Sequence, residues 1–162
     1  MDLRDEAIHQ AVSQQDIERA RALFREYAEW LKVDLCFQGF EGELATLPGD
    51  YAPPDGRLLI AYHHEKPVAC IALRRLDASS GEIKRLYVRP ETRGRRTGRR
   101  LVEQVIAAAR EIGYRRLVLD TLPQMTEAQA LYRSFGFRDI PGYYAKPVPG
   151  VVYLALDLEP AA

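Results

Sequence analysis

The chain has 162 residues, and its 23 lysines and arginines balance its 23 aspartates and glutamates to a formal net charge of zero. This length predicts a single domain, residues 1–162, with a core large enough to need neither a disulfide nor a metal staple. Proteins that bind nucleic acid mainly through its phosphates usually carry a basic excess, so we expect no nucleic-acid partner.

Cysteine and histidine usage and the apolar pattern narrow the class further. Cys36 and Cys70 lie far apart, and neither they nor His9, His63 and His64 show a metal-binding spacing. We therefore expect no metal and a reducing, cytoplasmic location. The first residues, MDLRDEAI, are charged where a secretory signal would be apolar. No apolar run approaches the roughly 18 residues needed to span a bilayer, so we expect no membrane partner.

The first third of the chain predicts a strand, a helix and a long connection. Residues 7–12 are typical of a short strand. Apolar residues then recur at helical spacing from Gln14 to Leu31, and Ser13 is suited to cap this helix. Residues 33–56 combine a short amphipathic segment with a loop rich in proline and glycine. Long ordered loops in compact domains tend to be functional.

The rest of the chain predicts six strands and two helices. We expect the strands at residues 57–64, 67–76, 82–88, 115–121, 137–140 and 151–158. We expect the helices at residues 97–112 and 126–135, which Gly113 and Gly136 would end. The first two of these strands, and the last two, are expected to form antiparallel hairpins.

The order of these elements predicts an α+β fold. A strand, a helix and a strand joined by short links form a crossover, which makes the strands at 82–88 and 115–121 a parallel pair. The sheet is therefore expected to be mixed, with antiparallel strands first, then this parallel pair, and helices on both faces. Ligands in such sheets lie beyond the carboxyl ends of the parallel strands.

Six arginines lie between the end of strand 82–88 and the helix at 97–112, in the stretch RPETRGRRTGRRL, residues 89–101. A helix N-terminus presents unpaired N–H groups that suit an anion. Cations at that position are unfavourable by roughly 0.3–1 kcal/mol each, and a phosphate group would remove this cost. The alternative is that the arginines are solvated or paired with Glu91 and Glu103.

Two motifs resemble the GNAT superfamily of acyl-CoA-dependent N-acetyltransferases. The first is the pyrophosphate loop, Gln/Arg-x-x-Gly-x-Gly/Ala, matched by Arg93, Gly94, Arg95, Arg96, Thr97 and Gly98. The second is Asn-x-x-Ala-x-x-Leu-Tyr-x-x-x-Gly-Phe, matched by Ala128, Leu131, Tyr132, Gly136 and Phe137. The resemblance covers residues 57–140, and there the chain resembles the family in the order of its elements as well.

The resemblance implies a cosubstrate and a set of roles. Acetyl-CoA would bind with its pyrophosphate on the loop from Arg93 to Gly98 and on Arg99. Backbone N–H groups of Leu86, Tyr87 and Val88 would contact the pantetheine arm and the developing oxyanion, in a gap where the two parallel strands splay apart. Tyr132 would protonate the leaving thiolate. Glu82 matches the general base of protein-acetylating relatives.

Each of these roles has a structural alternative. Tyr132 could simply pack its helix against the sheet, and Glu82 could end a turn beside Lys84. Asp120 is a further carboxylate near the expected cleft, and we rank it below Glu82.

Two residues depart from the family motifs. Arg96 stands where the loop has its first glycine, so we expect a negative φ there and a side chain that points away from the cradle or onto a phosphate. Met125 replaces the asparagine of the second motif, which would remove a side-chain hydrogen bond to the cofactor arm.

The acceptor is expected to be an amine, since an acetyl group passes from a thioester to nitrogen in this family. Candidate acceptor-site residues in the 33–56 segment and the GYYAK loop are acidic or aromatic, which suits an ammonium group. They are Asp34, Glu41, Glu43 and Asp50 with Phe37, Phe40, Tyr51, Tyr143 and Tyr144. The expected function is acetylation of a primary amine of a small molecule or amino acid by direct attack, in a monomer or homodimer. The alternatives are a protein or peptide acetyltransferase and a non-catalytic CoA-binding module.

Overall fold

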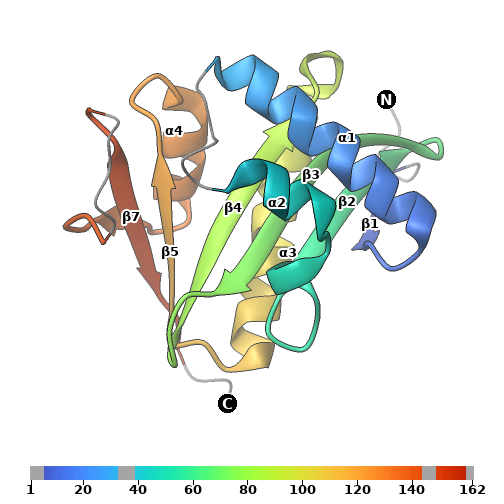
Figure 1. Ribbon diagram of the computed structural model, residues 1–162. Helices are drawn as coiled ribbons and strands as arrows, with labels where there is room; N and C mark the ends of the chain where they lie inside the picture. Colours follow the sequence, from blue (N-terminus) through green and yellow to red (C-terminus); the bar gives the residue numbers. More distant parts are fainter. Residues whose placement is uncertain (1–5, 33–38, 144–148, 160–162) are drawn as a thin grey trace.

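The computed structural model describes residues 6–32, 39–143 and 149–159, and seven strands in these ranges form one sheet in the order β1-β2-β3-β4-β5-β7-β6 (Figure 1). The strands are β1 Glu6–Gln10, β2 Arg57–His63, β3 Lys66–Arg75, β4 Ser80–Val88, β5 Arg116–Thr121, β6 Arg138–Asp139 and β7 Val152–Asp157. The predicted α+β class with a mixed sheet is confirmed.

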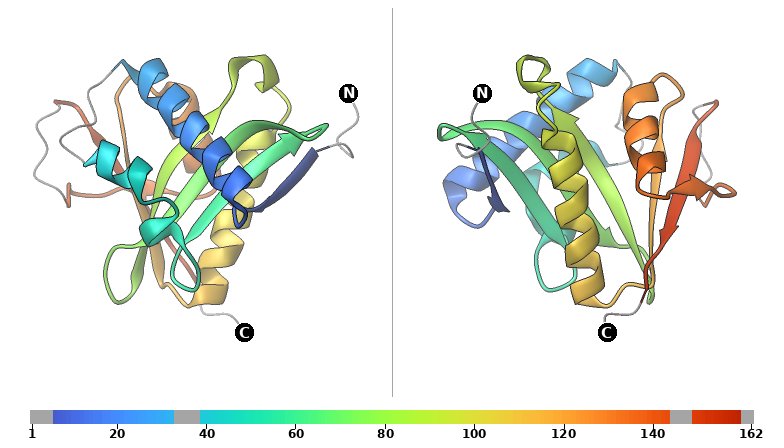
Figure 2. Two further views of the ribbon diagram at one scale, coloured as in Figure 1. Left: turned by 45° about the vertical axis from the view of Figure 1, so that its right-hand side comes forward. Right: turned by 180° about the vertical axis from the view of Figure 1, so that it is seen from behind.

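Helices cover both faces of the sheet. The α-helices are α1 Gln14–Leu31, α2 Phe40–Ala45, α3 Thr97–Ile112 and α4 Thr126–Ser134, with short 3₁₀ turns η3 Gly49–Tyr51 and η4 Pro90–Thr92. α1 and α2 lie on one face, and α3 and α4 lie on the other, with β4 visible between them (Figure 2). No helix in the described ranges has both the length and the apolar character to cross a bilayer.

The predicted helix at 14–31 agrees with α1 residue for residue. The amide of Asp16 donates to the Ser13 hydroxyl at 3.0 Å, as expected of an N-cap. α3 likewise spans the predicted 97–112 and ends at Gly113, whose φ of 105° satisfies the left-handed position that closes the helix. Strand boundaries differ from the predicted ones by one or two residues at most ends.

β4 and β5 form the expected parallel pair, but only over three residues. Ser80, Gly81 and Glu82 pair with residues 116–118 of β5, and the ladder ends there although β4 continues to Val88. Figure 1 shows the two strands diverging toward their carboxyl ends. The last six residues of β4 therefore have no ladder partner on β5, which leaves that edge of the backbone for other contacts.

A β-bulge at Arg85 divides β4 into two halves. Arg85 has a φ of 61°, and the register against β3 shifts between Cys70 and Ala72. Ile83 packs in the core beneath α3, so Lys84 faces the α1/α2 side. The extra residue lets Arg85 face that side as well, where Glu43 of α2 accepts two hydrogen bonds from its guanidinium at 2.9 and 3.0 Å.

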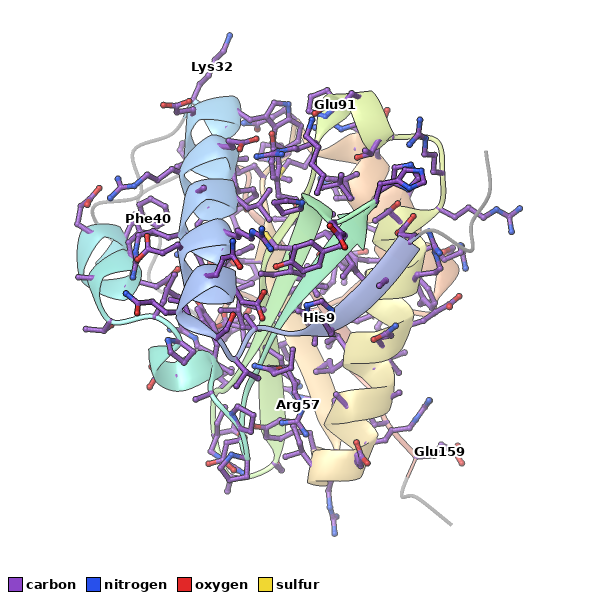
Figure 3. All side chains as sticks on the ribbon, turned by 90° about the vertical axis from the view of Figure 1, so that its right-hand side faces the viewer. His9, Lys32, Phe40, Arg57, Glu91 and Glu159 are labelled. Carbon is purple, nitrogen blue, oxygen red and sulfur yellow. The ribbon has the colours of Figure 1, made fainter. Side chains whose placement is uncertain are left out.

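After the bulge, the alternation resumes with the opposite phase. Leu86 and Val88 turn toward α3 and α4, whereas Tyr87 joins the core beneath α1. Seen from the side, side chains fill the spaces between the sheet and the helices on both faces (Figure 3). Lys32, after α1, and Glu91, after β4, lie at the same end of the molecule in that view.

Candidate active site

A pocket of about 510 Å³ opens where β4 and β5 diverge, beside the start of α3 and the start of α4. Its walls come from the end of β4, the arginine-rich loop, Trp30 of α1 and the first turn of α4. The lining residues used below are Leu86, Val88, Arg93, Arg96, Gly98 and Leu131. The predicted cradle and the unpaired end of β4 thus border one cavity.

The start of α3 faces this pocket. Intrahelical bonding of α3 begins with the Arg100 amide, which donates to the Arg96 carbonyl at 3.1 Å. The amides of Thr97, Gly98 and Arg99 precede that bond and are the groups that a helix N-terminus leaves for an anion. Thr97 and Gly98 both line the pocket.

Our expectation for the backbone of Arg96 is wrong. Its φ is 62° and its ψ is 17°, so it occupies the left-handed conformation of the glycine that the family motif has at this position. The tight entry into α3 requires this conformation, and a non-glycine residue there bears strain of about 1 kcal/mol. The Arg96 side chain is exposed and lines the pocket.

One carboxylate does reach the first turn of α3. Glu6 of β1 accepts a hydrogen bond from the Thr97 hydroxyl at 3.2 Å and forms an ion pair with Arg100. Glu6 is not part of the pocket wall. It therefore fastens β1 to the side of α3 without closing the end of the helix.

Two of the six arginines are bound by carboxylates far away in sequence. Arg89 donates to both oxygens of Glu26 on α1, at 2.9 and 2.5 Å, and Arg100 pairs with Glu6. The alternative of pairing with Glu91 and Glu103 is not what the structure has. These two arginines join α1 and β1 to the edges of the site.

The other four arginines contact no carboxylate within the described ranges. Arg93 stacks on the Trp30 ring at 4.7 Å, and Arg99 stacks on the Phe135 ring at 4.7 Å. Arg95 and Arg96 carry no ion pair there either. Because Arg93, Arg96 and Arg99 all line the pocket, this wall is strongly cationic.

Tyr132 lies on α4, buried against Phe137 with a ring distance of 5.4 Å. Its neighbour Leu131 lines the pocket, whereas Tyr132 itself is behind the wall. Burial raises the pKa of Tyr132, and the nearby Tyr27 and Asp120 raise it further. The Tyr132 phenol is therefore protonated at neutral pH.

Glu82 is fully buried, at 0% exposure, where the β4–β5 ladder ends. Its Oε1 accepts from Arg74 Nε at 2.9 Å, and its Oε2 accepts from the Tyr143 hydroxyl at 2.9 Å. Asp120 lies further along β5, two residues past Val118, the last residue that pairs with β4. Glu82 and Tyr143 thus come together from two segments, with Asp120 on the neighbouring strand.

Part of the predicted acceptor site is core. Phe40 and Tyr51 are buried beneath α1, and the Tyr51 hydroxyl donates to Glu43 at 3.0 Å, so these residues support Arg85. Glu41 and Asp50 are exposed. Asp34, Phe37 and Tyr144 lie outside the described residues.

Two residues near the gap were not predicted. Burial raises the pKa of Tyr27 on α1 to about 12. Of the nearby charges, that of Arg85 lowers this pKa and that of Asp120 raises it. Lys84 is buried one residue before the bulge. In the sequence, Tyr27 fits the apolar spacing of α1 and Lys84 fits the pattern of a strand. Only their three-dimensional contacts therefore show that they lie near the gap.

The fold is shared with solved acetyltransferases. An acetyltransferase of Streptococcus agalactiae superposes with a TM-score of 0.79 at 22% identity, covering 96% of this chain and 100% of that one. The PaiA N-acetyltransferase of Thermoplasma acidophilum, solved in complex with coenzyme A, superposes with a TM-score of 0.75 at 18% identity, covering 94% and 99%.

Sequence comparison identifies the family. The profile of the Acetyltransferase (GNAT) family matches residues 15–137. An uncharacterized N-acetyltransferase of Schizosaccharomyces pombe is 40% identical over 147 residues, which cover 90% of each chain. The chain belongs to the GNAT family, and it is an N-acetyltransferase.

Proposed function

We propose that this enzyme transfers an acetyl group from acetyl-CoA to a primary amine of a small molecule or amino acid. The observation that carries the proposal is the single cavity that joins a cationic helix start to the unpaired end of β4. A coenzyme A complex is known for a structural relative with the same fold. The pocket size falls within the range of small-ligand sites, about 300–1,000 Å³.

The pyrophosphate would lie at the start of α3. Amides from Thr97 to Arg99 would donate to its oxygens, and Arg93, Arg95 and Arg96 would neutralise its charge. The pantetheine arm would then run along the unpaired edge of β4, beside Leu86, Tyr87 and Val88. The amides of Leu86 and Val88 point to this edge, since the Arg89 amide, and with it that of Tyr87, points to β3. We assign the oxyanion of the tetrahedral intermediate to a backbone donor in this stretch.

The acceptor amine must lose a proton before it attacks, because an alkylamine with a pKa near 10.4 is almost wholly protonated at pH 7. We propose Glu82 as the base. Since Glu82 is buried and bonded to Tyr143, the proton would pass to the Tyr143 oxygen while the Tyr143 hydroxyl proton moves to Glu82.

The amine nitrogen then forms a bond to the thioester carbon. Collapse of the intermediate breaks the carbon–sulfur bond, and the departing thiolate takes the phenolic proton of Tyr132. The second proton of the attacking nitrogen is then released and restores the Tyr132 phenol. The products are the acetylated amine and free coenzyme A. Tyr132 has this proton to give because its phenol is protonated at neutral pH, although burial raises its pKa and so weakens it as an acid.

The test is release of free thiol from acetyl-CoA in the presence of amines, polyamines, amino acids and lysine-containing peptides. We expect turnover with a small amine. Turnover with peptides only would favour the protein-acetylating alternative. Acetyl-CoA binding by calorimetry without thiol release for any acceptor would instead favour a CoA-binding module.

A further inference from the structure

Lys84 is a charged residue with almost no exposure, on the face of the sheet that α1 and α2 cover. Only 6% of it is exposed, and it lies on β4 two residues past the last residue paired with β5. Its side chain faces the α1/α2 side, as Glu82 does. It is therefore a buried cation at the mouth of the gap between the parallel strands.

Within the described ranges Lys84 makes no hydrogen bond and no ion pair. The Lys84 nitrogen is not fully sealed from solvent. Burial lowers the pKa of Lys84, and the charges of Glu82 and Asp120 only partly oppose this. A buried ammonium without a partner is unfavourable for the fold.

The charged groups around Lys84 have other partners. Glu82 is bound by Arg74 and Tyr143, and Arg85 is bound by Glu43. Asp120 lies across the gap on β5 and acts on Lys84 through its charge. The ammonium of Lys84 is therefore available to a partner that the described residues do not supply.

The charge balance indicates what that is. Arg74, Lys84 and Arg85 face the three carboxylates of Glu43, Glu82 and Asp120, so the group is formally neutral. A zwitterion with one ammonium and one carboxylate would leave this balance unchanged. A phosphate dianion would add unpaired negative charge to a buried region, which is unfavourable.

We propose that the acceptor is a primary amine that also carries a carboxylate, and that Lys84 binds this carboxylate. The inference rests on the proposed function and narrows its acceptor to an amino acid, α or ω. Lys84 would be a specificity-determining residue: it would hold one end of the acceptor while the other end attacks the thioester.

The placement of Lys84 suits this role. Leu86, whose amide is a proposed oxyanion donor, follows Lys84 by two residues, a Cα separation of at most about 7 Å in an extended strand. The attacking nitrogen must come within roughly 3.5 Å of the thioester carbon. Lys84 and the proposed oxyanion donor are therefore near neighbours on β4, and the acceptor would span both.

The test compares matched acceptors and matched variants. Thiol release is measured for the common amino acids, β-alanine and 4-aminobutyrate, each against its own amide, which lacks the carboxylate charge. Lys84→Met removes the ammonium at similar volume, and Lys84→Arg keeps a positive charge. Lys66→Met, at an exposed position of β3, is the control.

In the native enzyme we expect kcat/KM to be at least about 30-fold higher for one acid than for its amide, as for loss of a buried charge partner. Lys84→Met should abolish this preference by slowing the acid alone, with the Kd of acetyl-CoA unchanged. Lys84→Arg should restore part of it, and Lys66→Met should behave as the native enzyme.

Two outcomes overturn the proposal while sparing the proposed function. They are equal rates for acids and amides in the native enzyme, and an equal loss for both in Lys84→Met, which would make Lys84 a base or a structural residue. Lack of turnover with every amine would overturn the proposed function itself.

A second measurement does not depend on turnover. In ¹³C-lysine NMR of the acetyl-CoA complex, the Lys84 signal is assigned by its loss in Lys84→Met and followed while the same acids are added. We expect at least one acid to shift it toward the protonated form, and its amide to leave it unchanged. No shift with any acid would also overturn the proposal.

Discussion

At the scale of single residues, Tyr132 shows how a buried phenol can be set up for proton transfer. A thiolate leaving group with a pKa near 8.5 can take a proton from a phenol that is still protonated when the carbon–sulfur bond breaks. Tyr132 is protonated at neutral pH, and the rise in its pKa on burial makes it a weaker acid than an exposed tyrosine. Its place on α4, next to the wall residue Leu131, fixes it relative to the pocket.

Replacing Tyr132 with phenylalanine removes the proton and keeps the ring. We expect kcat to fall by about 100-fold or more, the lower range for loss of general acid catalysis, while acetyl-CoA affinity measured by calorimetry stays unchanged. Tyr114→Phe is the matched control, because the Tyr114 hydroxyl bonds the Asp55 carbonyl at the opposite end of β5. Equal turnover in the two variants would exclude Tyr132 as the acid.

Arg96 combines two effects that substitutions can separate. Arg96→Ala removes the guanidinium and keeps the left-handed strain, whereas Arg96→Gly removes both. Because the φ of residue 96 is 62°, we expect the glycine variant to be more stable than the alanine variant by about 1 kcal/mol. Urea unfolding measures this difference, and equal stability would contradict the strain.

The two Arg96 variants should have equal acetyl-CoA affinity, lower than that of the native enzyme. The loss should shrink at high salt, because screening weakens the attraction between an exposed guanidinium and a phosphate. A loss confined to one variant would mean that the backbone conformation, rather than the charge, governs binding.

At the scale of elements, the start of α3 is the part of the site most easily disabled. A Cβ on Gly98 would meet Leu131 and Val88 at 3.5 and 3.6 Å, which is ordinary contact. Gly98→Ala should therefore fold and bind. Gly98→Glu should fold equally well yet lose measurable acetyl-CoA binding, since its carboxylate would occupy the place proposed for the pyrophosphate. Circular dichroism measures whether each variant folds, and calorimetry measures whether it binds acetyl-CoA. Retained binding in Gly98→Glu would count against the cradle.

Periodic elements were predictable from the sequence, because their apolar spacing is local. α1 and α3 have the expected bounds, and the parallel pair followed from the strand–helix–strand order. The bulge at Arg85 was not predictable. It depends on Glu43, 42 residues away, which holds the buried guanidinium, and no local pattern encodes that contact.

The same limit applies to the candidate site. The motifs predicted the proposed cradle and the proposed acid Tyr132, since their residues are consecutive or on one helix. They did not identify which arginines are bound by carboxylates, because Glu6 and Glu26 come from β1 and α1. Nor did they single out Lys84, which is an ordinary strand lysine until its burial is known.

At the scale of the whole molecule, the burial of Lys84 has a consequence for stability. Its pKa in the folded protein is lowered by burial. Well below that folded pKa, the lysine is charged in both states and the penalty is full. As the pH rises from there toward 10.5, the folded state releases its proton first, so the free energy of unfolding increases. Above 10.5 both states are neutral and the penalty is gone.

Lys84→Met should therefore be more stable than the native protein at about pH 7, and its advantage should shrink toward about pH 9.5 by no more than about 1.4 kcal/mol per pH unit. Urea unfolding of both proteins at each pH measures this, and effects of the tyrosines cancel in the difference. A Lys84→Met protein less stable than the native one at pH 7 would show that Lys84 supports the fold.

The single extra residue in β4 also shapes how this enzyme can evolve. It shifts the inward and outward alternation between the half of β4 that pairs with β5 and the half that we propose binds the cofactor arm. Deleting that one residue would exchange the inward-facing and outward-facing side chains in the rest of β4. We therefore expect this strand to tolerate point substitutions but not insertions or deletions. New acceptor preferences in this lineage should thus arise by exchanging side chains around a backbone that keeps its length.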